Sequence, residues 1–569
     1  MKKLINDVAA VVPDMLEGLV ALNPDLALLR DSGVVIRIDA QVVAARGEVA
    51  LVSGGGAGHE PAHAGYVGPG MLSAAVAGEV FTSPSTDAVL DAIRAVAGPA
   101  GVLLIVKNYT GDRFNFGLAA EIARSEGTPV EMVIVADDVA LSASGEHAGR
   151  RGLAGTVFVH KIAGAAAAEH RSLKEVAQIA RGVAADLGTM GIGLTPCTVP
   201  AAGTPGFTLA DNEVEWGLGI HGEPGVKRGA LEPAHVVVET LLAKIIDDLK
   251  LATHERVALL VNNLGGTPSS EIAIVAGSAM RYLRSRNLRV DRAWSGTFLS
   301  ALEMAGVSLT LLRVDDERVT WLDAASRTSA WPLTGGVPSE TVYQGQTHKA
   351  AQQSGPGLSP QSALRRVVES VCNTLIAAEP VLTEMDQRVG DGDFGISAAR
   401  VSRAVLSAID ECPAESDPAG VLRALSSTVR RVMGGTSGPL YAVMLLRAAG
   451  ALGGRDTAAL TARDWSNALS AAVEGVIQLG GAQPGERTMI DALYPAASAM
   501  RATLDGAAAA SQALQAAVDA AQAGAQATAA MHPKRGRSSY VGDRALGFVD
   551  PGAYAIGLWL EAIRRALGA

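Results

Sequence analysis

Cysteine, aromatic residues and basic stripes are all scarce in this sequence. The 569 residues include 3 cysteines, Cys197, Cys372 and Cys412, which lie far apart and form no Cys-x-x-Cys pair. This pattern argues against a disulfide framework and a structural zinc site, and it favours a reducing cytoplasm. The net charge is −10, aromatics make up 4%, and no basic stripe carries interleaved aromatic residues, so we do not expect nucleic acid as a partner.

Long hydrophobic runs are also missing. The longest uncharged stretch, between Asp186 and Asp211, is interrupted by three prolines and several glycines, so it cannot form a membrane-spanning helix. The first eight residues include an asparagine and an aspartate where a signal peptide would be apolar. We therefore expect a soluble, cytoplasmic protein that binds small molecules and has no membrane partner.

The chain is too long for a single hydrophobic core, since a domain typically holds about 150 residues. Up to about residue 330, short β-rich apolar runs alternate with alanine-rich helical segments, and such runs predict buried parallel strands. Residues 1–333 are therefore predicted to form an α/β domain whose ligands bind at the carboxyl ends of strands. The predicted strands are Val34–Ile38, Val102–Val106, Val130–Val135, Val257–Val261 and Leu309–Val314.

A second domain follows a change in composition. Residues 334–360 are rich in Gly, Ser, Pro, Gln and Thr and lack periodic hydrophobicity, so we predict a linker. Beyond them helical periodicity dominates, and the stretch Ala507–Ala530 is mostly Ala, Gln, Ser and Gly. Residues 361–569 are therefore predicted to form an all-α domain.

Three aspartates lie within eight residues of the second domain, Asp386, Asp391 and Asp393. Neighbouring carboxylates repel one another, so the cluster is costly unless a hard cation neutralises it, although a solvated acidic turn has a similar composition. The glycine between Asp391 and Asp393 permits the bent backbone that both need to face one ion. Magnesium combines a few carboxylates with water and polyphosphate oxygens, so the cluster predicts a magnesium site beside a nucleotide.

No Gly-x-x-x-x-Gly-Lys-Ser/Thr phosphate loop is present, so a nucleotide must bind by another route. The segment Met433–Pro439 opens onto a helical run and could aim backbone amides and two hydroxyl groups at phosphates, although glycine turns before helices are common. Arg487 could neutralise charge on a transferring phosphoryl group, or it could be an ordinary surface arginine.

Histidines mark the first domain. His59 and His63 match the zinc-peptidase pattern His-Glu-x-x-His, but the proline between them and the flanking glycines oppose the continuous helix that the motif needs. We therefore predict a glycine-rich substrate loop with one working histidine. His221 stands in a second glycine-rich bend. Lys107 and Asp112, at the end of a predicted strand, complete the polar set, although a carboxylate there is equally able to cap a helix.

Together these segments resemble the dihydroxyacetone kinase family, and the resemblance covers essentially the whole chain. Having both domains on one polypeptide is similar to the ATP-dependent branch of the family. The resemblance implies ATP as the donor, an α/β unit of two subdomains, and a helical barrel with the ADP and magnesium site at one rim. The segments that carry it are Ser53–Leu72, Phe81–Pro84, Lys107–Asp112, Gly219–Gly225, Gly390–Gly395, Gly434–Gly438, Pro484–Met489 and Asp550–Gly552.

The resemblance also implies roles for residues of the first domain. His221 would attack the substrate carbonyl and form a hemiaminal, which holds the ketone covalently and excludes glycerol. Asp112 would act as general base on the hydroxyl, with His59 as its acid or base partner and Lys107 orienting the substrate. The remaining substrate contacts implied are Gly56, Ala57 and Gly58.

In the second domain the resemblance implies two magnesium ions on Asp386, Asp391 and Asp393, which clamp the phosphates. One departure is Ile396, where many family members have threonine, so only its backbone amide could contact a phosphate. The implied nucleotide contacts are Asp393, Phe394, Gly395, Ile396, Thr436, Ser437, Gly438, Gly481, Arg487, Asp550, Pro551 and Gly552.

The predicted activity is ATP-dependent phosphorylation of dihydroxyacetone, or of glyceraldehyde or another short ketose. A four-carbon ketose such as erythrulose is the alternative on the same scaffold, because one extra hydroxymethyl group changes only the shape of the pocket. A zinc hydrolase and a sugar sensor are further alternatives, but the three aspartates would be superfluous in a sensor. The resemblance favours a homodimer with crossed domains and leaves open an FAD-splitting cyclase activity.

Overall fold

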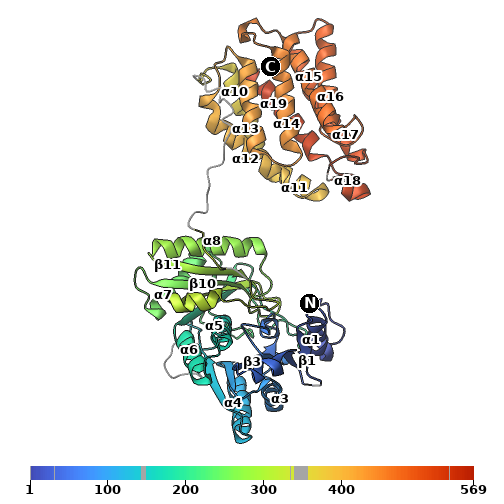
Figure 1. Ribbon diagram of the computed structural model, residues 1–569. Helices are drawn as coiled ribbons and strands as arrows, with labels where there is room; N and C mark the ends of the chain where they lie inside the picture. Colours follow the sequence, from blue (N-terminus) through green and yellow to red (C-terminus); the bar gives the residue numbers. More distant parts are fainter. Residues whose placement is uncertain are drawn as a thin grey trace. The chain divides into compact units, whose positions relative to one another are not determined.

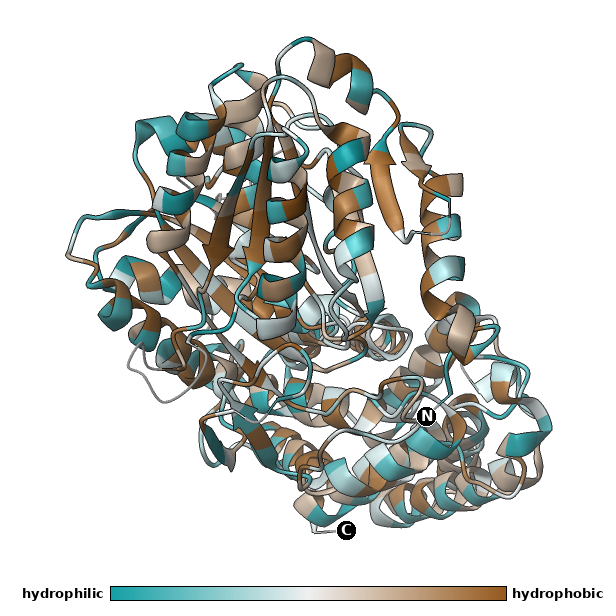
Figure 2. Ribbon diagram, turned by 90° about the horizontal axis from the view of Figure 1, so that it is seen from below, coloured by the Kyte–Doolittle hydropathy of each residue, from teal (hydrophilic) through white to brown (hydrophobic). Residues whose placement is uncertain are grey.

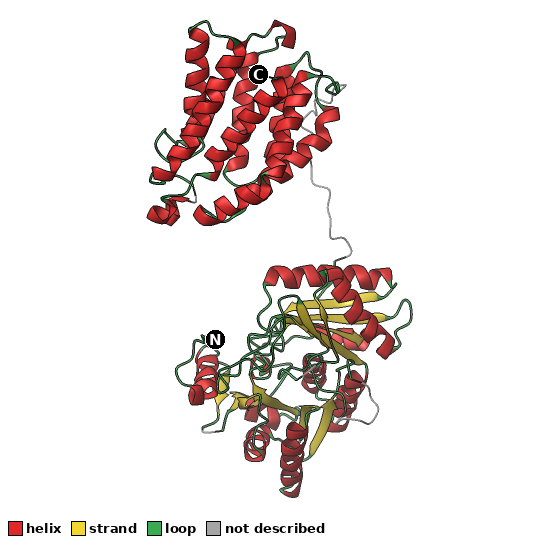
Figure 3. Cartoon of the chain, turned by 180° about the vertical axis from the view of Figure 1, so that it is seen from behind, coloured by secondary structure: helices red, strands yellow, loops and turns green. Residues whose placement is uncertain are grey.

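The computed structural model describes residues 2–30, 32–141, 149–223, 225–332, 335–338, 357–536 and 538–568. The chain divides into two compact units, Met1–Tyr343 and Gln344–Ala569. Within the described ranges, strands occur only in the first unit, and the second is built from helices (Figure 3). Most of the linker predicted at 334–360 lies outside the described residues.

The first sheet of the α/β unit contains β1 Leu26–Leu28, β2 Val34–Arg37, β3 Ala50–Ala57, β4 Ala74–Val80, β5 Val102–Lys107 and β6 Val130–Val135. Their order across the sheet is β1-β2-β4-β3-β5-β6. Figure 1 labels β1 and β3 of this sheet. β3 pairs in parallel with β4 and β5, and β5 pairs in parallel with β6. β2 runs antiparallel to both of its neighbours.

The second sheet contains β7 Leu187–Gly193, β8 Glu213–Trp216, β9 Lys227–Ala230, β10 Arg256–Asn263, β11 Arg289–Gly296 and β12 Gly306–Arg313. Their order is β11-β10-β12-β7-β8-β9. Only β10 and β11 pair in parallel, while β12 runs antiparallel to β10 and β7. The bend that carries His221 follows β8, which is paired with the end of β7.

Helices cover the outer faces of the two sheets, and a buried layer lies between them. α3 and α4 pack with the first sheet, and α7 and α8 pack with the second. Nearly every residue of α5 is buried, in a core that also contains residues of β5 and β10. The strands accordingly appear mostly brown in Figure 2, whereas the helices alternate brown and teal. The helices are α1 Val11–Ala21, α2 Ala40–Ala45, α3 Thr86–Val96, α4 Thr110–Ser125, α5 Thr156–Ala168, α6 Leu173–Ala185, α7 Ala234–Leu249, α8 Ser269–Ser285 and α9 Asp316–Asp323.

The second unit is a ring of helices. Successive ring members pack against each other, and the last, α19, packs against the first, α10, so that α10, α12 to α17 and α19 close a barrel. These eight helices line an interior apolar cavity of about 600 Å³. The helices are α10 Ala363–Ala377, α11 Glu379–Val389, α12 Phe394–Ala408, α13 Pro418–Val432, α14 Ser437–Leu452, α15 Ala462–Gly480, α16 Ile490–Asp505, α17 Ala510–Ala527, α18 Ser538–Val541 and α19 Pro551–Leu567.

The predicted fold class is confirmed, with an α/β unit of two sheets followed by an all-α unit. The predicted strands coincide with β2, β5, β6, β10 and β12, but the expectation that all of them are parallel is wrong for β2 and β12. β1 and β2 are neighbours joined without a helix, and parallel neighbours need a longer crossover. β12 lies between β10 and β7 and runs antiparallel to both. The apolar composition of a strand indicates that both of its faces are buried, but it does not indicate whether the strand runs parallel or antiparallel to its neighbours.

Two further expectations can be compared with the structure. All three cysteines are free and buried. No helix within the described part of the chain is long and apolar enough to span a membrane.

Gly395→Ala should destabilise the helical unit, because a Cβ there would lie 2.3 Å from Thr383 Oγ1 and 2.4 Å from the Glu379 carbonyl oxygen. The clash would separate α11 from α12 and lower the free energy of unfolding by about 1–3 kcal/mol in urea titrations. Gly450→Ala is the matched control, because nothing lies within 4 Å of its Cβ position in α14. That change should stabilise by up to about 1 kcal/mol. Equal effects at the two positions would contradict this packing.

Candidate active site

The loop Gly217–Glu223, which we call the His221 loop, holds its histidine by a carboxylate. His221 Nδ1 lies 2.8 Å from Glu223 Oε1, and the His221 amide donates to Glu223 Oε2 at 2.9 Å. Burial alone would raise the pKa of Glu223, but its hydrogen bonds and charge interaction with His221 lower it to about 2. An ionised carboxylate only accepts, so Nδ1 carries a proton and the lone pair of neutral His221 is on Nε2.

Three rings surround the His221 imidazole. Their centroids lie 4.8 Å away for His59, 5.2 Å for Phe81 and 4.7 Å for Tyr109, all in edge-to-face geometry. His59 in turn stacks on Phe81. The His221 side chain keeps 20% of its surface exposed. The ring is therefore fixed in orientation but open to a small ligand.

His59 lies two residues after β3, and its partner is an uncharged acceptor. Its Nδ1 is 2.9 Å from the Ser300 carbonyl oxygen, which can only accept, so Nδ1 is protonated. Its Nε2 is buried and has no hydrogen-bond partner within the described part of the chain. Burial, together with the charges of Lys107 and His221, holds the pKa of His59 well below its ordinary value. His59 is therefore a neutral imidazole whose Nε2 can accept a hydrogen bond from a ligand.

Lys107 and Asp112 converge on the backbone of β3. Lys107 ends β5 and Asp112 lies in the first turn of α4, and both side chains are buried. A Cβ at Gly55 would lie 3.1 Å from Lys107 Nζ and 3.5 Å from Asp112 Oδ2, and Gly55 has φ of +154°, so this position requires glycine. The Ser83 hydroxyl donates to Asp112 Oδ1.

The Lys107 ammonium is the second buried polar group of the site without a hydrogen-bond partner among the described residues. Burial lowers its pKa, and the charge of Asp112 acts in the opposite direction. The predicted substrate-loop residues Gly56, Ala57 and Gly58 form the adjoining end of β3 and its turn. The structure thus brings His59, Lys107 and Asp112 of the first sheet together with His221 of the second.

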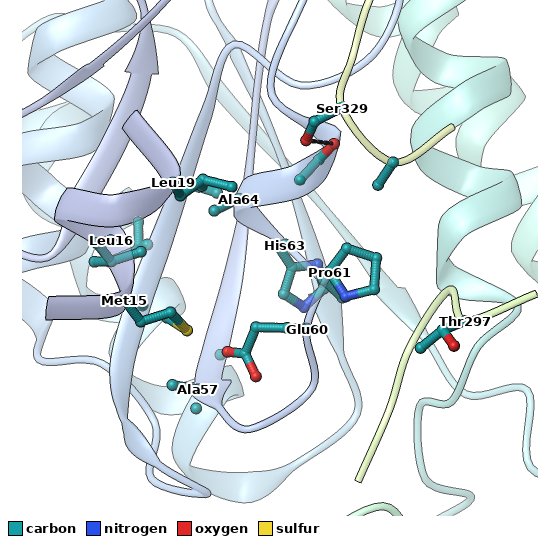
Figure 4. A pocket seen from close by; sticks show the side chains of 18 residues that line it. Met15, Leu16, Leu19, Ala57, Glu60, Pro61, His63, Ala64, Thr297 and Ser329 are labelled. Atoms are coloured by element: carbon teal, nitrogen blue, oxygen red, sulfur yellow. Dashed lines mark hydrogen bonds between the residues drawn. The ribbon is translucent and has the colours of Figure 1, made fainter. Parts of the chain in front are cut away.

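The His-Glu-x-x-His segment forms a turn and not a helix. His63 Nδ1 lies 3.0 Å from His160 Nε2, so His63 and His59 have different partners and do not form a joint metal site. Glu60 and His63 instead line a cavity of about 450 Å³, whose far wall is Met15, Leu16 and Leu19 of α1 (Figure 4).

Asp386, Asp391 and Asp393 do come together, at the junction of α11 and α12. One carboxylate oxygen from each lies within 4.8 Å of the others, and no other such group of three metal-ligating residues occurs in the described ranges. Asp386 Oδ2 also accepts from the Phe394 amide at 3.2 Å. Two of the three residues are exposed, so a hard cation with several waters fits this donor set.

The predicted phosphate loop precedes α14. Gly434, Gly435 and Thr436 are exposed, and the first turn of α14 has no side-chain cap, so its amides can face a ligand. Gly481 ends α15 in a left-handed conformation, with φ of +66°. Ile396 is 49% exposed in the first turn of α12.

Arg487 is fully buried and is therefore not a surface arginine. Its Nη2 donates to the carbonyl oxygens of Ala545 and Phe548 at 3.2 and 3.0 Å, while Nε and Nη1 have no partner among the described residues. Asp550 caps α19 by accepting from the Ala553 amide. Burial raises the pKa of Asp550 to about 6, with Arg487 lowering it and Asp386 raising it, so these side chains share one electrostatic neighbourhood.

Several side chains at these sites were not predicted. Glu223, Phe81 and Tyr109 hold His221, and Asp491 accepts from the Gly485 and Thr488 amides to shape the loop of Arg487. Glu223 lies two residues after His221, and this short spacing could have indicated that the carboxylate contacts the imidazole. Phe81 belongs to the segment Phe81–Pro84 that carries the family resemblance, but the sequence did not indicate that its ring contacts His221.

Comparison with known proteins identifies the family. The Dak1 domain model matches residues 17–330 and the DAK2 domain model matches residues 388–565. The chain is 44% identical over 580 residues to the human triokinase/FMN cyclase, covering 100% of this chain and 99% of that protein. The chain belongs to the single-chain, ATP-dependent dihydroxyacetone kinase family.

Other relatives in the family carry different substrate names. The D-erythrulose kinase of Mycolicibacterium smegmatis is 35% identical, covering 99% of this chain and 98% of that protein. The dihydroxyacetone kinase of C. freundii, solved in complex with AMP-PNP and Mg²⁺, is 36% identical with a TM-score of 0.62, covering 99% of both chains. The family resemblance seen in the motifs is thus confirmed along the whole chain.

Glu223→Gln should remove a stabilisation that depends on pH. The pKa of Glu223 in the folded protein, about 2, lies below its ordinary 4.5, so the stabilisation is complete above 4.5 and is lost as the pH falls toward 2. Urea unfolding of both proteins between about pH 3 and pH 7 should show a difference that shrinks below 4.5. The exposed Glu239→Gln should change the unfolding free energy by no more than about 0.5 kcal/mol throughout. A difference that did not vary with pH would contradict the pairing.

Proposed function

We propose that this kinase phosphorylates a primary hydroxyl group of dihydroxyacetone, with glyceraldehyde or another short ketose as further substrates. The observation that carries the proposal is that two buried polar atoms, His59 Nε2 and Lys107 Nζ, have no hydrogen-bond partner among the described residues and lie beside Asp112 and the His221 imidazole. Leaving such atoms unpaired costs about 1–3 kcal/mol each, which a small hydroxylated ligand would recover. The names of the relatives support the same substrate class.

The ketone would be held covalently by His221. The Nε2 lone pair forms a bond to the carbonyl carbon, and the C=O π pair moves to the oxygen, which takes up a proton. Nδ1 gives up its proton, so the product is a neutral hemiaminal whose mass equals protein plus ketose. Glu223, ionised and 2.8 Å from Nδ1, stabilises the positive charge that develops on the ring while Nε2 forms the bond, before this proton leaves to solvent. Glycerol has no carbonyl carbon and would not be captured.

The hydroxyl to be phosphorylated would then be deprotonated by Asp112, the general base. The Ser83 hydroxyl bond to Asp112 Oδ1 leaves Oδ2 as the oxygen toward the β3 backbone. Lys107, which is also beside Gly55, orients the substrate oxygens. His59 is neutral and accepts a hydrogen bond through Nε2. Of the two roles predicted for it beside Asp112, acid or base, this geometry favours the base.

The three aspartates fit magnesium, and Asp386, Asp391 and Asp393 would hold two ions. Bound magnesium would offset charge on the phosphates of ATP. Nucleotide contacts come from residues 393–396, Thr436–Gly438, Gly481, Arg487 and Asp550–Gly552. Because the Arg487 guanidinium already binds two carbonyl groups, it can offset phosphate charge only through Nε and Nη1.

A four-carbon ketose is the alternative substrate, supported by the 35% identical D-erythrulose kinase. Rates measured with dihydroxyacetone, glyceraldehyde and erythrulose at saturating ATP would order the substrates. The name of the human relative also supports a test with FAD for release of a cyclic flavin nucleotide. The homodimer and the cytoplasmic location rest on the sequence expectations alone.

His221→Ala should abolish the ketose adduct that intact-protein mass spectrometry detects in the wild type. Without Nε2 there is no nucleophile at this position, so ketose phosphorylation should be lost as well. The exposed His235→Ala serves as the matched control and should keep both the adduct and the activity. If His221→Ala retained full ketone activity, the covalent mechanism would be wrong.

Asp391→Asn and Asp393→Asn should each raise the magnesium concentration needed for half-maximal activity by at least about tenfold. Asparagine keeps the shape of the side chain but removes the charge that a hard cation requires. Asp519→Asn, at an exposed position of α17, should leave the magnesium dependence unchanged. Unaltered magnesium titrations in both cluster variants would contradict the assignment.

A further inference from the structure

A buried ion pair lies behind the His221 loop. Arg151 Nε and Nη2 lie 2.7 and 2.6 Å from Asp138 Oδ2, and the side chains of Arg151 and Asp138 are only 11% and 1% exposed. Burial raises the pKa of Asp138 to about 6 against the opposing charge of Arg151. The pair is therefore desolvated, and its geometry is tightly constrained.

The same guanidinium binds the backbone of the His221 loop. Arg151 Nη2 donates to the Gly217 carbonyl oxygen at 2.7 Å. Arg151 Nη1 lies 2.8 Å from the Cβ position of Gly219, a position that also meets Glu223 Oε2 at 2.1 Å. The guanidinium thus touches the loop where it starts and where it passes the carboxylate that holds His221.

Asp138 is itself fixed to the core of the α/β unit. Its Oδ1 accepts from the Ala140 amide at 2.9 Å, and its backbone forms a bridge with Thr189 of β7. The Asp138 amide donates to the Arg151 carbonyl oxygen at 3.1 Å. Asp138 and Arg151 belong to the connection between β6 of the first sheet and α5, whereas the loop they hold follows β8 of the second sheet.

From these contacts we infer that Arg151, held by Asp138, is a positioning residue that sets His221 against the groups of the first sheet. His59, Lys107 and Asp112 come from the first sheet and His221 from the second, so their relative placement needs a rigid connection. The forked guanidinium supplies it, because one planar group binds a carboxylate and a backbone carbonyl at once. This inference rests on the covalent role proposed for His221.

The test is the ketose concentration that gives half-maximal adduct in intact-protein mass spectrometry. Arg151→Met should raise that concentration by at least about tenfold, because small displacements of a reacting group are costly. The half-saturating ATP concentration should stay unchanged, since no nucleotide contact is altered. Arg151→Lys keeps a charge for Asp138 but lacks the fork, so it should lie between Arg151→Met and the wild type.

Arg318→Met is the matched control. Arg318 is 15% exposed, pairs with Asp186 at 2.7 Å and donates to the Arg313 carbonyl oxygen at 2.7 Å. Asp186 precedes β7, whereas the His221 loop bonds to Gly191 near the other end of that strand. This control should lose thermal stability but keep the wild-type adduct titration.

If Arg151→Met reached half-maximal adduct at the same ketose concentration as the wild type, the inference would be overturned. If Arg151→Met does not fold, the adduct titration is compared between Arg151→Lys and the wild type. Equal half-maximal ketose concentrations in these two proteins would overturn the inference. A wild-type protein that formed no adduct would instead contradict the covalent function. In that case the positioning role is tested by the rate at which diethyl pyrocarbonate modifies His221, measured by peptide mapping. Equal rates in the wild type and Arg151→Lys would reject the positioning role.

Discussion

The close approach of the β3 backbone to two buried ionic groups is the constraint on which the proposed ketose site depends. Lys107 Nζ and Asp112 Oδ2 occupy the space where a side chain at residue 55 would stand, so only glycine is accommodated. Removing an ammonium and a carboxylate from water is expensive unless each finds a partner. Asp112 has the Ser83 hydroxyl as a partner, whereas Lys107 Nζ has none among the described residues. Burial of both groups strengthens their electrostatic interactions with any ligand that binds beside them.

Two histidines of the site differ because their partners differ. His221 faces a carboxylate and His59 faces a backbone carbonyl, yet both partners accept and both place the proton on Nδ1. The charge of Glu223 stabilises the positive charge that develops on the His221 ring when Nε2 forms a bond, whereas deep burial keeps His59 uncharged. One imidazole is thus suited to nucleophilic attack and the other to hydrogen bonding.

The helical unit has a different electrostatic design. Its acidic cluster lies at the junction of α11 and α12 with two of its members exposed, as a cation with bound water requires. Arg487 is buried and bonded to carbonyl oxygens, which makes it a part of the loop framework as well as a candidate phosphate contact. The proposed carbonyl capture would thus use buried groups of the α/β unit, and the proposed phosphoryl delivery would use a solvent-exposed cluster of the helical unit.

The sequence by itself determined the fold class, because local spacing reports helices, strands and glycine-rich loops. It also predicted His59, Lys107, Asp112, His221 and the three aspartates as site residues, and these remain predictions. Tertiary structure alone decided strand direction in β2 and β12, and the partners that set protonation. Phe81, Ser300 and Arg151 reach His59 and the His221 loop from remote segments, so nothing in local sequence indicates them. Protonation and orientation depend on burial and on contacts between distant residues, and those exist only after the chain has folded.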